Sequence, residues 1–107
     1  MDQPRYRTLI EKDEYSKQLD GLVDRYSAQR DLLEYIINGL LWGIATNPQA
    51  YDRTTWRVRW APSNSFGAKI PAFVIVFQIQ NEGLEDEHVL LLWIDELSAI
   101  RDVLVAD

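Results

Sequence analysis

The sequence predicts an α+β fold in which an N-terminal helix hairpin packs on a three- to four-stranded antiparallel sheet, followed by a short C-terminal helix. Two patterns lead to this class: apolar residues recur at helical spacing in the first half, and short β-branched or aromatic runs fill the second half. A length of 107 residues is a common domain size and leaves no room for a second core. We therefore expect residues 1–107 to form a single domain.

The first half contains one short strand pattern and two helix patterns. Residues 5–10 have a β-like pattern whose polar side chains suit an exposed edge strand. Residues 13–26 carry apolar side chains at the spacing of an amphipathic helix. Ser27 is expected to cap a second helix that stops at Asn47-Pro48. The predicted buried side of this second helix consists of Leu32, Leu33, Ile36, Ile37, Leu40, Leu41 and Ile44.

Three strands are expected in the second half, over residues 56–60, 72–80 and 88–94. A loop rich in proline, glycine and serine over residues 61–71 separates the first two strands, and a turn separates the second from the third. Asp95 is expected to cap the final short helix. The apolar stripe of that helix would consist of Leu97, Ile100, Val103 and Leu104.

The second and third of these strands are apolar on both faces. One face of an antiparallel sheet usually meets water, so doubly apolar strands imply a cover over the second face as well. That cover is either the C-terminal tail of the chain or another molecule. The residues expected to make this contact are Trp60, Val74, Val76, Leu90 and Leu92.

Composition argues against several classes of function. The formal charge of −6 repels phosphate at long range, which disfavours nucleic acid as a partner. The absence of cysteine excludes disulfides, thiolate catalysis and cysteine-based zinc sites. The N-terminus lacks the apolar core of a secretory signal and no apolar run can span a bilayer, so we expect a cytoplasmic protein without a membrane partner. No cofactor or metal motif occurs, and neither group is expected.

Four residues are weak candidates for catalysis: Arg57, Arg59, Lys69 and His88. Alternation along a strand displays Arg57 and Arg59 on one face, where they can hold phosphate through charge-assisted bonds. Lys69 lies in the neighbouring loop, and His88 is the sole histidine, the residue type used most often for general acid-base catalysis. The plainer interpretation is that the arginines form surface salt bridges, that Lys69 is solvated and that His88 lacks a catalytic partner. The sequence therefore leaves the catalytic residues open.

A run of acidic residues precedes the last strand, namely Glu82, Glu85, Asp86 and Glu87. These carboxylates lack the ligand spacing and glycine placement of an EF-hand loop. We expect a solvated hairpin loop, whose charge discourages edge-to-edge association of sheets.

The element order of strand, helix, helix and three strands resembles the RelE/ParE superfamily of bacterial toxin-antitoxin toxins over about residues 5–95. Residues 56–59, which read Trp-Arg-Val-Arg, are similar to the arginine-bearing pattern of that family's first strand after the helices. Residues 73–77 and 89–93 resemble its next two strands. The resemblance implies a small domain that packs two helices on an antiparallel sheet and is wrapped by an antitoxin.

Two departures from this family bear on activity. Family members that cleave RNA often carry basic residues just after the last strand, where this chain has Asp95-Glu96-Leu97. The strand arginine of the family is also missing, because residues 72–74 are uncharged. Both departures argue against conventional cleavage of messenger RNA.

Three hypotheses of function follow. The favoured one is a RelE/ParE-like toxin-antitoxin component, or an inactive relative, that acts through contact with an antitoxin-like protein along the apolar sheet face and a groove beside the helix hairpin. The second is a ribosome-dependent or free endoribonuclease that uses Arg57, Arg59, Lys69 and His88. The third is a homodimeric structural module in which two copies cover each other's sheet.

Overall fold

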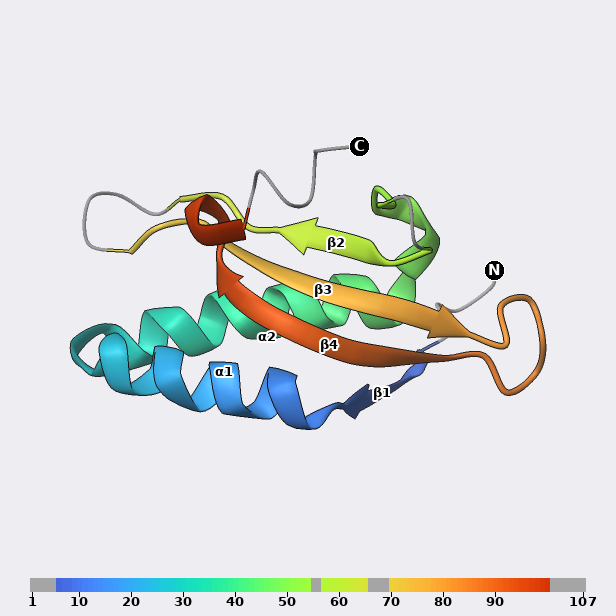
Figure 1. The fold of residues 1–107 in the computed structure, drawn as a ribbon, viewed down its shortest axis with the longest axis horizontal. Coiled ribbons are helices and arrows are strands. Elements are labelled where there is room, and N and C mark those ends of the chain that lie inside the picture. The colour runs from blue at the N-terminus through green and yellow to red at the C-terminus, as the bar shows by residue number, and fades with distance from the viewer. Residues whose placement is uncertain (1–5, 55–56, 66–69, 101–107) are drawn as a thin grey trace.

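The computed structural model of the chain describes residues 6–54, 57–65 and 70–100. These ranges form an α+β domain in which one strand, two long helices and three further strands follow one another in the predicted order (Figure 1). The helices are α1 (Asp13–Arg25) and α2 (Arg30–Thr46), with single 3-10 turns at η1 (Ser27–Gln29) and η2 (Pro48–Ala50). The strands are β1 (Thr8–Glu11), β2 (Arg59–Pro62), β3 (Phe73–Gln80) and β4 (His88–Glu96).

The sheet is mixed, so the prediction of a purely antiparallel sheet is wrong. Its strand order is β1-β4-β3-β2, in which β2, β3 and β4 are antiparallel neighbours. At the edge, β1 pairs with β4 in parallel, and Thr8 lies opposite His88. A parallel neighbour requires a long connection between the two strands, and here both helices, β2 and β3 intervene.

The core lies between the helices and the sheet face that they cover. The apolar positions predicted for α2 are buried or half-buried, and α1 packs against β4. One cluster joins the two helices to β2, β3 and β4. Its buried members include Tyr15, Leu22, Leu33, Ile36, Ile37, Leu40, Ile44, Ala61, Phe73, Ile75, Phe77, Val89, Leu91 and Ile94.

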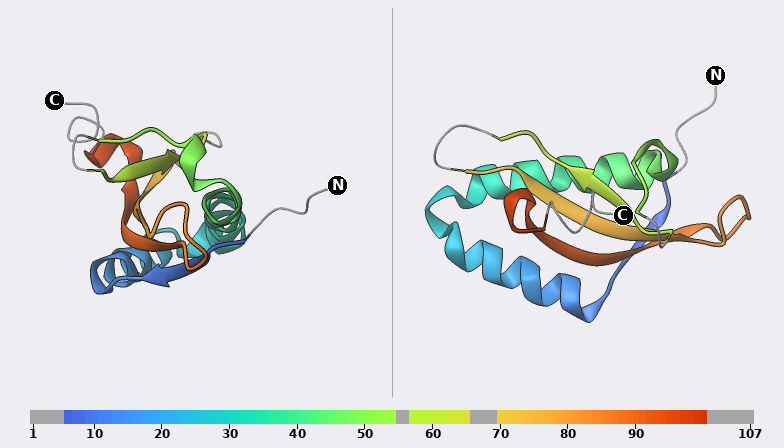
Figure 2. Two further views of the ribbon diagram at one scale, coloured as in Figure 1. Left: turned by 90° about the vertical axis from the view of Figure 1, so that its right-hand side faces the viewer. Right: turned by 45° about the horizontal axis from the view of Figure 1, so that its top comes forward.

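Two helix boundaries differ from the sequence prediction. Ser27 opens η1 and does not cap α2, which begins at Arg30 after that turn. Asp95 lies inside β4, where its Oδ1 accepts a hydrogen bond from the Glu96 N–H at 2.8 Å, so it does not cap a helix. Residues 97–100 are helical, and this turn lies on the side of the sheet opposite α2 (Figure 2). The predicted positions Val103 and Leu104 lie outside the described residues.

The first strand after the helices is displaced along the sequence. We expected residues 56–60, whereas β2 spans Arg59–Pro62 and Trp56 lies outside the described residues. The backbone of Arg57 is left-handed, with φ of 66°, and this conformation does not continue a β-strand. None of the helices in the described ranges has both the length and the apolar content to cross a lipid bilayer.

Candidate functional site

Apolar side chains line the sheet face that the helices leave uncovered, which we call the outer face. On β3, Phe73 and Ile75 are buried towards the helices, whereas Val74 and Val76 alternate to the outer face. Val74 is nevertheless fully buried. The chain folds back at this end of β3, where the Leu97 N–H donates to the Ala72 carbonyl at 2.8 Å. Val74 is therefore packed inside the single chain and is not displayed on its surface.

The other four predicted contact residues are half-buried on or beside the outer face, namely Trp60, Val76, Leu90 and Leu92. Val76 lies between Trp60 of β2 and Trp93 of β4 in the pairing register. The register shifts between Val76 and Phe77, so that Leu92 has no partner on β3. Beyond Leu90 the strip continues onto Ile10 of β1, which is 41% exposed. The cover that the doubly apolar strands predict is thus incomplete over the centre of the outer face.

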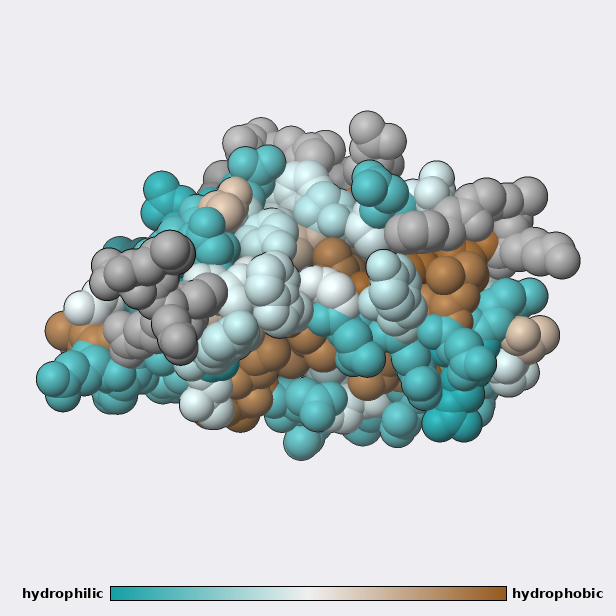
Figure 3. Space-filling model, turned by 180° about the vertical axis from the view of Figure 1, so that it is seen from behind, coloured by the Kyte–Doolittle hydropathy of each residue, from teal (hydrophilic) through white to brown (hydrophobic). Residues whose placement is uncertain are grey.

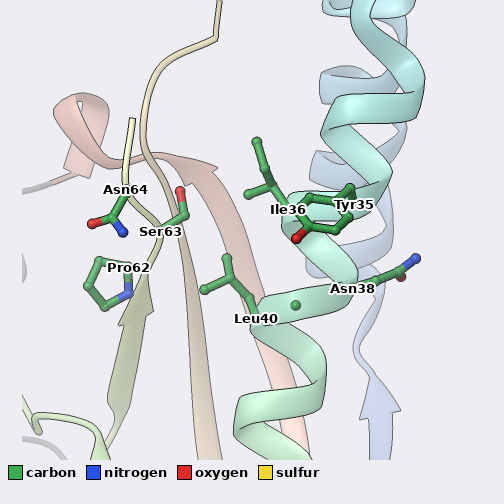
Figure 4. Close-up of a pocket in the computed structure, with 8 residues that line it drawn as sticks. Tyr35, Ile36, Asn38, Leu40, Pro62, Ser63 and Asn64 are labelled. Carbon is green, nitrogen blue, oxygen red and sulfur yellow. The ribbon is translucent and has the colours of Figure 1, made fainter. Parts of the chain in front are cut away.

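A second apolar feature is a groove of about 540 Å³ between the middle of α2 and the end of β2, which we call the α2 groove. Figure 4 shows Ile36 and Leu40 of α2 on one side, with Pro62 and Ser63 on the other. None of the lining residues that the structure describes is charged, although charged residues make up 26% of the chain. Its lining residues are Tyr35, Ile36, Asn38, Gly39, Leu40, Pro62, Ser63 and Asn64.

Two large aromatic side chains stand on the solvent side of α2. Tyr35 is 72% exposed and Trp42 is 60% exposed. A separation of seven residues places both on nearly the same line along the helix. Gly39 lies between them, and a Cβ added there would meet nothing within 4 Å. Seen from the side of α2, apolar surface reaches solvent between polar patches (Figure 3).

Three arginines line a polar pocket of about 530 Å³ at the start of β2, which we call the arginine pocket. Arg57 and Arg59 were expected to lie together, and Arg53 joins them through an isolated bridge to Arg59. The remaining lining comes from the end of β3 and the turn after it. These residues are Gln78, Ile79, Gln80, Asn81 and Glu82.

The three arginines differ in how firmly they are held. Arg59 has a side chain that is only 12% exposed, and its Nη1 donates to the carbonyls of Tyr51 at 2.7 Å and Gln49 at 3.3 Å. Its Nη2 lies 3.8 Å from a Glu82 carboxylate oxygen. Arg53 and Arg57 are exposed, and neither guanidinium has a hydrogen bond or ion pair within the described part of the chain.

The predicted catalytic residues do not all converge. His88 lines a different pocket beside Thr8 and Ile10, and its Nδ1 lies 2.9 Å from the Asp86 carbonyl. Lys69 lies outside the described residues. No cluster of metal-ligating side chains occurs within residues 6–54, 57–65 and 70–100. The structure therefore brings Arg57 and Arg59 into one pocket and places His88 in another.

Glu87 is buried, which corrects the prediction of a solvated acidic loop at this position. The other three acidic residues of the run are exposed, but only 2% of the Glu87 side chain is. Its carboxylate accepts hydrogen bonds from Arg7 Nε at 2.6 Å, the Gly83 N–H at 2.7 Å and Gln49 Nε2 at 3.1 Å. The Gly83 amide is the largest influence lowering the pKa of Glu87, burial opposes it, and Arg7 and Gln49 add to the lowering.

Sequence patterns did not single out Tyr35, Trp42 or Arg53. The two aromatics lie seven residues apart among the polar positions of the predicted helix, and this spacing could have indicated an exposed contact face. Arg53 precedes the strand pattern, and only the bridge to Arg59 brings it to the pocket.

Comparisons of this chain with protein-family models, with curated proteins and with solved structures found no match.

Proposed function

We propose that this chain acts by binding a protein partner, as a RelE/ParE-like toxin-antitoxin component or an inactive relative of such toxins. The observation that carries the proposal is the α2 groove, whose described lining residues are uncharged and include the exposed Tyr35, with the exposed Trp42 seven residues further along the same helix. Tyrosine and tryptophan are enriched among the residues that dominate binding energy at protein interfaces. An apolar helix laid in a groove is one of the recurring modes of peptide recognition.

The shape of the site favours a helical segment of a separate protein. Gly39 lets a partner backbone approach α2 closely, because its surface has no side chain at this point. The half-buried strip on the outer face offers a second area for an extended segment of the same partner. A partner that combines helical and extended segments is also what the resemblance to RelE/ParE toxins implies.

A second copy of the chain is a poorer occupant. Two copies with a formal charge of −6 each repel one another. Pairing through the edge of β2 is also hindered, because the Trp60 N–H already donates to the Asp52 carbonyl and Pro62 has no N–H to offer. We therefore favour an unlike partner over a homodimer.

Co-expression with the product of the adjacent small reading frame tests this proposal. The expected result is a stable complex in size-exclusion chromatography with light scattering, together with growth arrest that the partner relieves if the chain is an active toxin. Tyr35→Ala and Trp42→Ala should each weaken the complex by at least about tenfold, as truncation of an interface anchor does. Tyr6→Ala removes an aromatic that is 62% exposed elsewhere and serves as the matched control.

Two outcomes would contradict the proposal. One is a wild-type chain that stays monomeric in the presence of every neighbouring gene product. The other is a complex whose affinity is unchanged by Tyr35→Ala and Trp42→Ala, since the partner would then bind at another surface.

A further inference from the structure

We propose that the arginine pocket binds the phosphate group of a small ligand. The inference is independent of the protein-docking proposal, because the arginine pocket and the α2 groove share no lining residue.

The pocket exists because the β2–β3 ladder stops early. The last pair is Arg59 with Phe77, and the same register continued by two positions would place Arg57 opposite Ile79. Arg57 instead has a left-handed backbone, with φ of 66°, which ends the strand and leaves the edge of β3 open at Ile79. Residues other than glycine and asparagine seldom take this conformation, and such strained positions cluster at binding sites.

The charge of the pocket is opposite to that of the protein. Among the lining residues that the structure describes, three guanidinium groups against the carboxylate of Glu82 give a net charge of +2, in a chain of formal charge −6. Arg59 is oriented by two backbone carbonyls, while Arg53 and Arg57 have no partner within the described residues. A phosphate monoester carries nearly two negative charges at neutral pH and matches this imbalance.

Donor chemistry favours phosphate over a carboxylate. The planar guanidinium presents parallel N–H groups that bind phosphate oxygens in a bidentate manner. Three arginines offer more such donors than the two oxygens of one carboxylate can accept. The amide side chains of Gln78 and Gln80 line the same pocket and can add uncharged donors, whereas the Asn81 amide already donates to Asp86.

A small ligand fits better than a nucleic acid. The pocket volume of about 530 Å³ falls in the range of small-molecule sites. A polyanion would also meet the acidic remainder of the chain, whereas a single phosphate group meets only the local positive field.

Isothermal titration with inorganic pyrophosphate and with inorganic phosphate, at constant ionic strength, tests the inference in the full chain. We expect saturable binding of one equivalent, with acetate binding at least about tenfold more weakly because it offers fewer oxygens. Arg53→Gln and Arg57→Gly should each weaken pyrophosphate binding by at least about tenfold. Glu82→Gln should strengthen it by about two- to fivefold, since it removes the competing carboxylate.

The variants are chosen so that loss of binding is not mistaken for loss of folding. Arg59 is left intact because it holds the Tyr51 and Gln49 carbonyls. Arg57→Gly relieves a left-handed backbone, so its thermal unfolding midpoint should equal or exceed that of the wild type. Arg30→Gln, which alters an exposed arginine paired with Glu34 on α2, is the matched control and should leave binding unchanged.

Several results would overturn the inference. These are absence of pyrophosphate binding, binding that Arg53→Gln and Arg57→Gly leave intact, or acetate binding as tight as phosphate. A single-stranded RNA ten-mer that binds more tightly than pyrophosphate would likewise replace a small ligand with a polymer. Trp42→Ala should leave the titration unaltered, which keeps this result separate from the test of protein docking.

Discussion

Replacing Glu87 with glutamine should destabilise the fold strongly. The carboxylate joins three separate parts of the chain: Arg7 before β1, Gln49 in η2 and Gly83 in the β3–β4 turn. Glutamine has nearly the same shape but turns an NH₂ group towards one of these donors and removes the negative charge that lies against Arg7. Arg7 is only 14% exposed, although it keeps a bond of 2.6 Å to the Thr46 carbonyl.

The expected loss is about 3 kcal/mol of unfolding free energy, at the lower end of what breaking a buried ion pair costs because Arg7 keeps that second bond. Urea unfolding at pH 7 measures it. With an m value of about 1.5 kcal/mol per molar, the midpoint should fall by about 2 M. Glu34→Gln breaks only the exposed pair with Arg30, at 3.0 Å, and should change stability by no more than about 0.5 kcal/mol.

The loss should also depend on pH. Because the pKa of Glu87 is lower in the folded state than the ordinary value of 4.5, its contribution is complete above about pH 4.5 and disappears as the pH falls through the folded pKa. The difference in unfolding free energy between wild type and Glu87→Gln should therefore become smaller as the pH falls from 5 to 3. A gap below about 1 kcal/mol at pH 7, or one that is equal at both ends of this range, would refute a role for the ionised carboxylate.

Three further substitutions test the packing. Gly43→Ala would place a methyl group against the Tyr51 hydroxyl, so chemical denaturation should show an unfolding free energy lower by about 1–3 kcal/mol. The methyl group of Gly39→Ala meets open space, so this variant should have an unfolding free energy higher by up to about 1 kcal/mol. Equal effects of the two would contradict the close approach. Tyr15→Phe removes a buried hydroxyl that has no partner among the described residues and should raise the unfolding free energy by about 1 kcal/mol, while a loss of similar size would reveal a bond to that hydroxyl.

Local periodicity accounts for the parts of the fold that the sequence predicted well. Leu33, Ile36, Ile37, Leu40 and Ile44 follow helical spacing and are all buried. The long strands β3 and β4 likewise follow from dense β-branched and aromatic runs bounded by turn residues. These patterns report neighbours that are close in sequence, which is why they succeed.

The features that were missed depend on distant contacts. The sequence around Thr8 does not show that its strand pairs in parallel with the strand of His88. The sequence around Glu87 likewise does not show that Arg7, 80 residues away, donates to its carboxylate. At Arg57 the alternating pattern of residues 56–60 predicts a strand, but the left-handed backbone ends the ladder at Arg59. Arg57 and Arg59 still meet in one pocket, though a broken strand brings them there.

The parallel pairing of β1 with β4 has a consequence for the newly made protein. Translation delivers β1 before β4, and the paired residues lie about 80 positions apart, so β1 has no partner until β4 has been made. Until then the hydrogen-bonding edge of β3 that β4 will occupy stays open to other chains. Unpaired strand edges of this kind make an incompletely folded chain prone to aggregation.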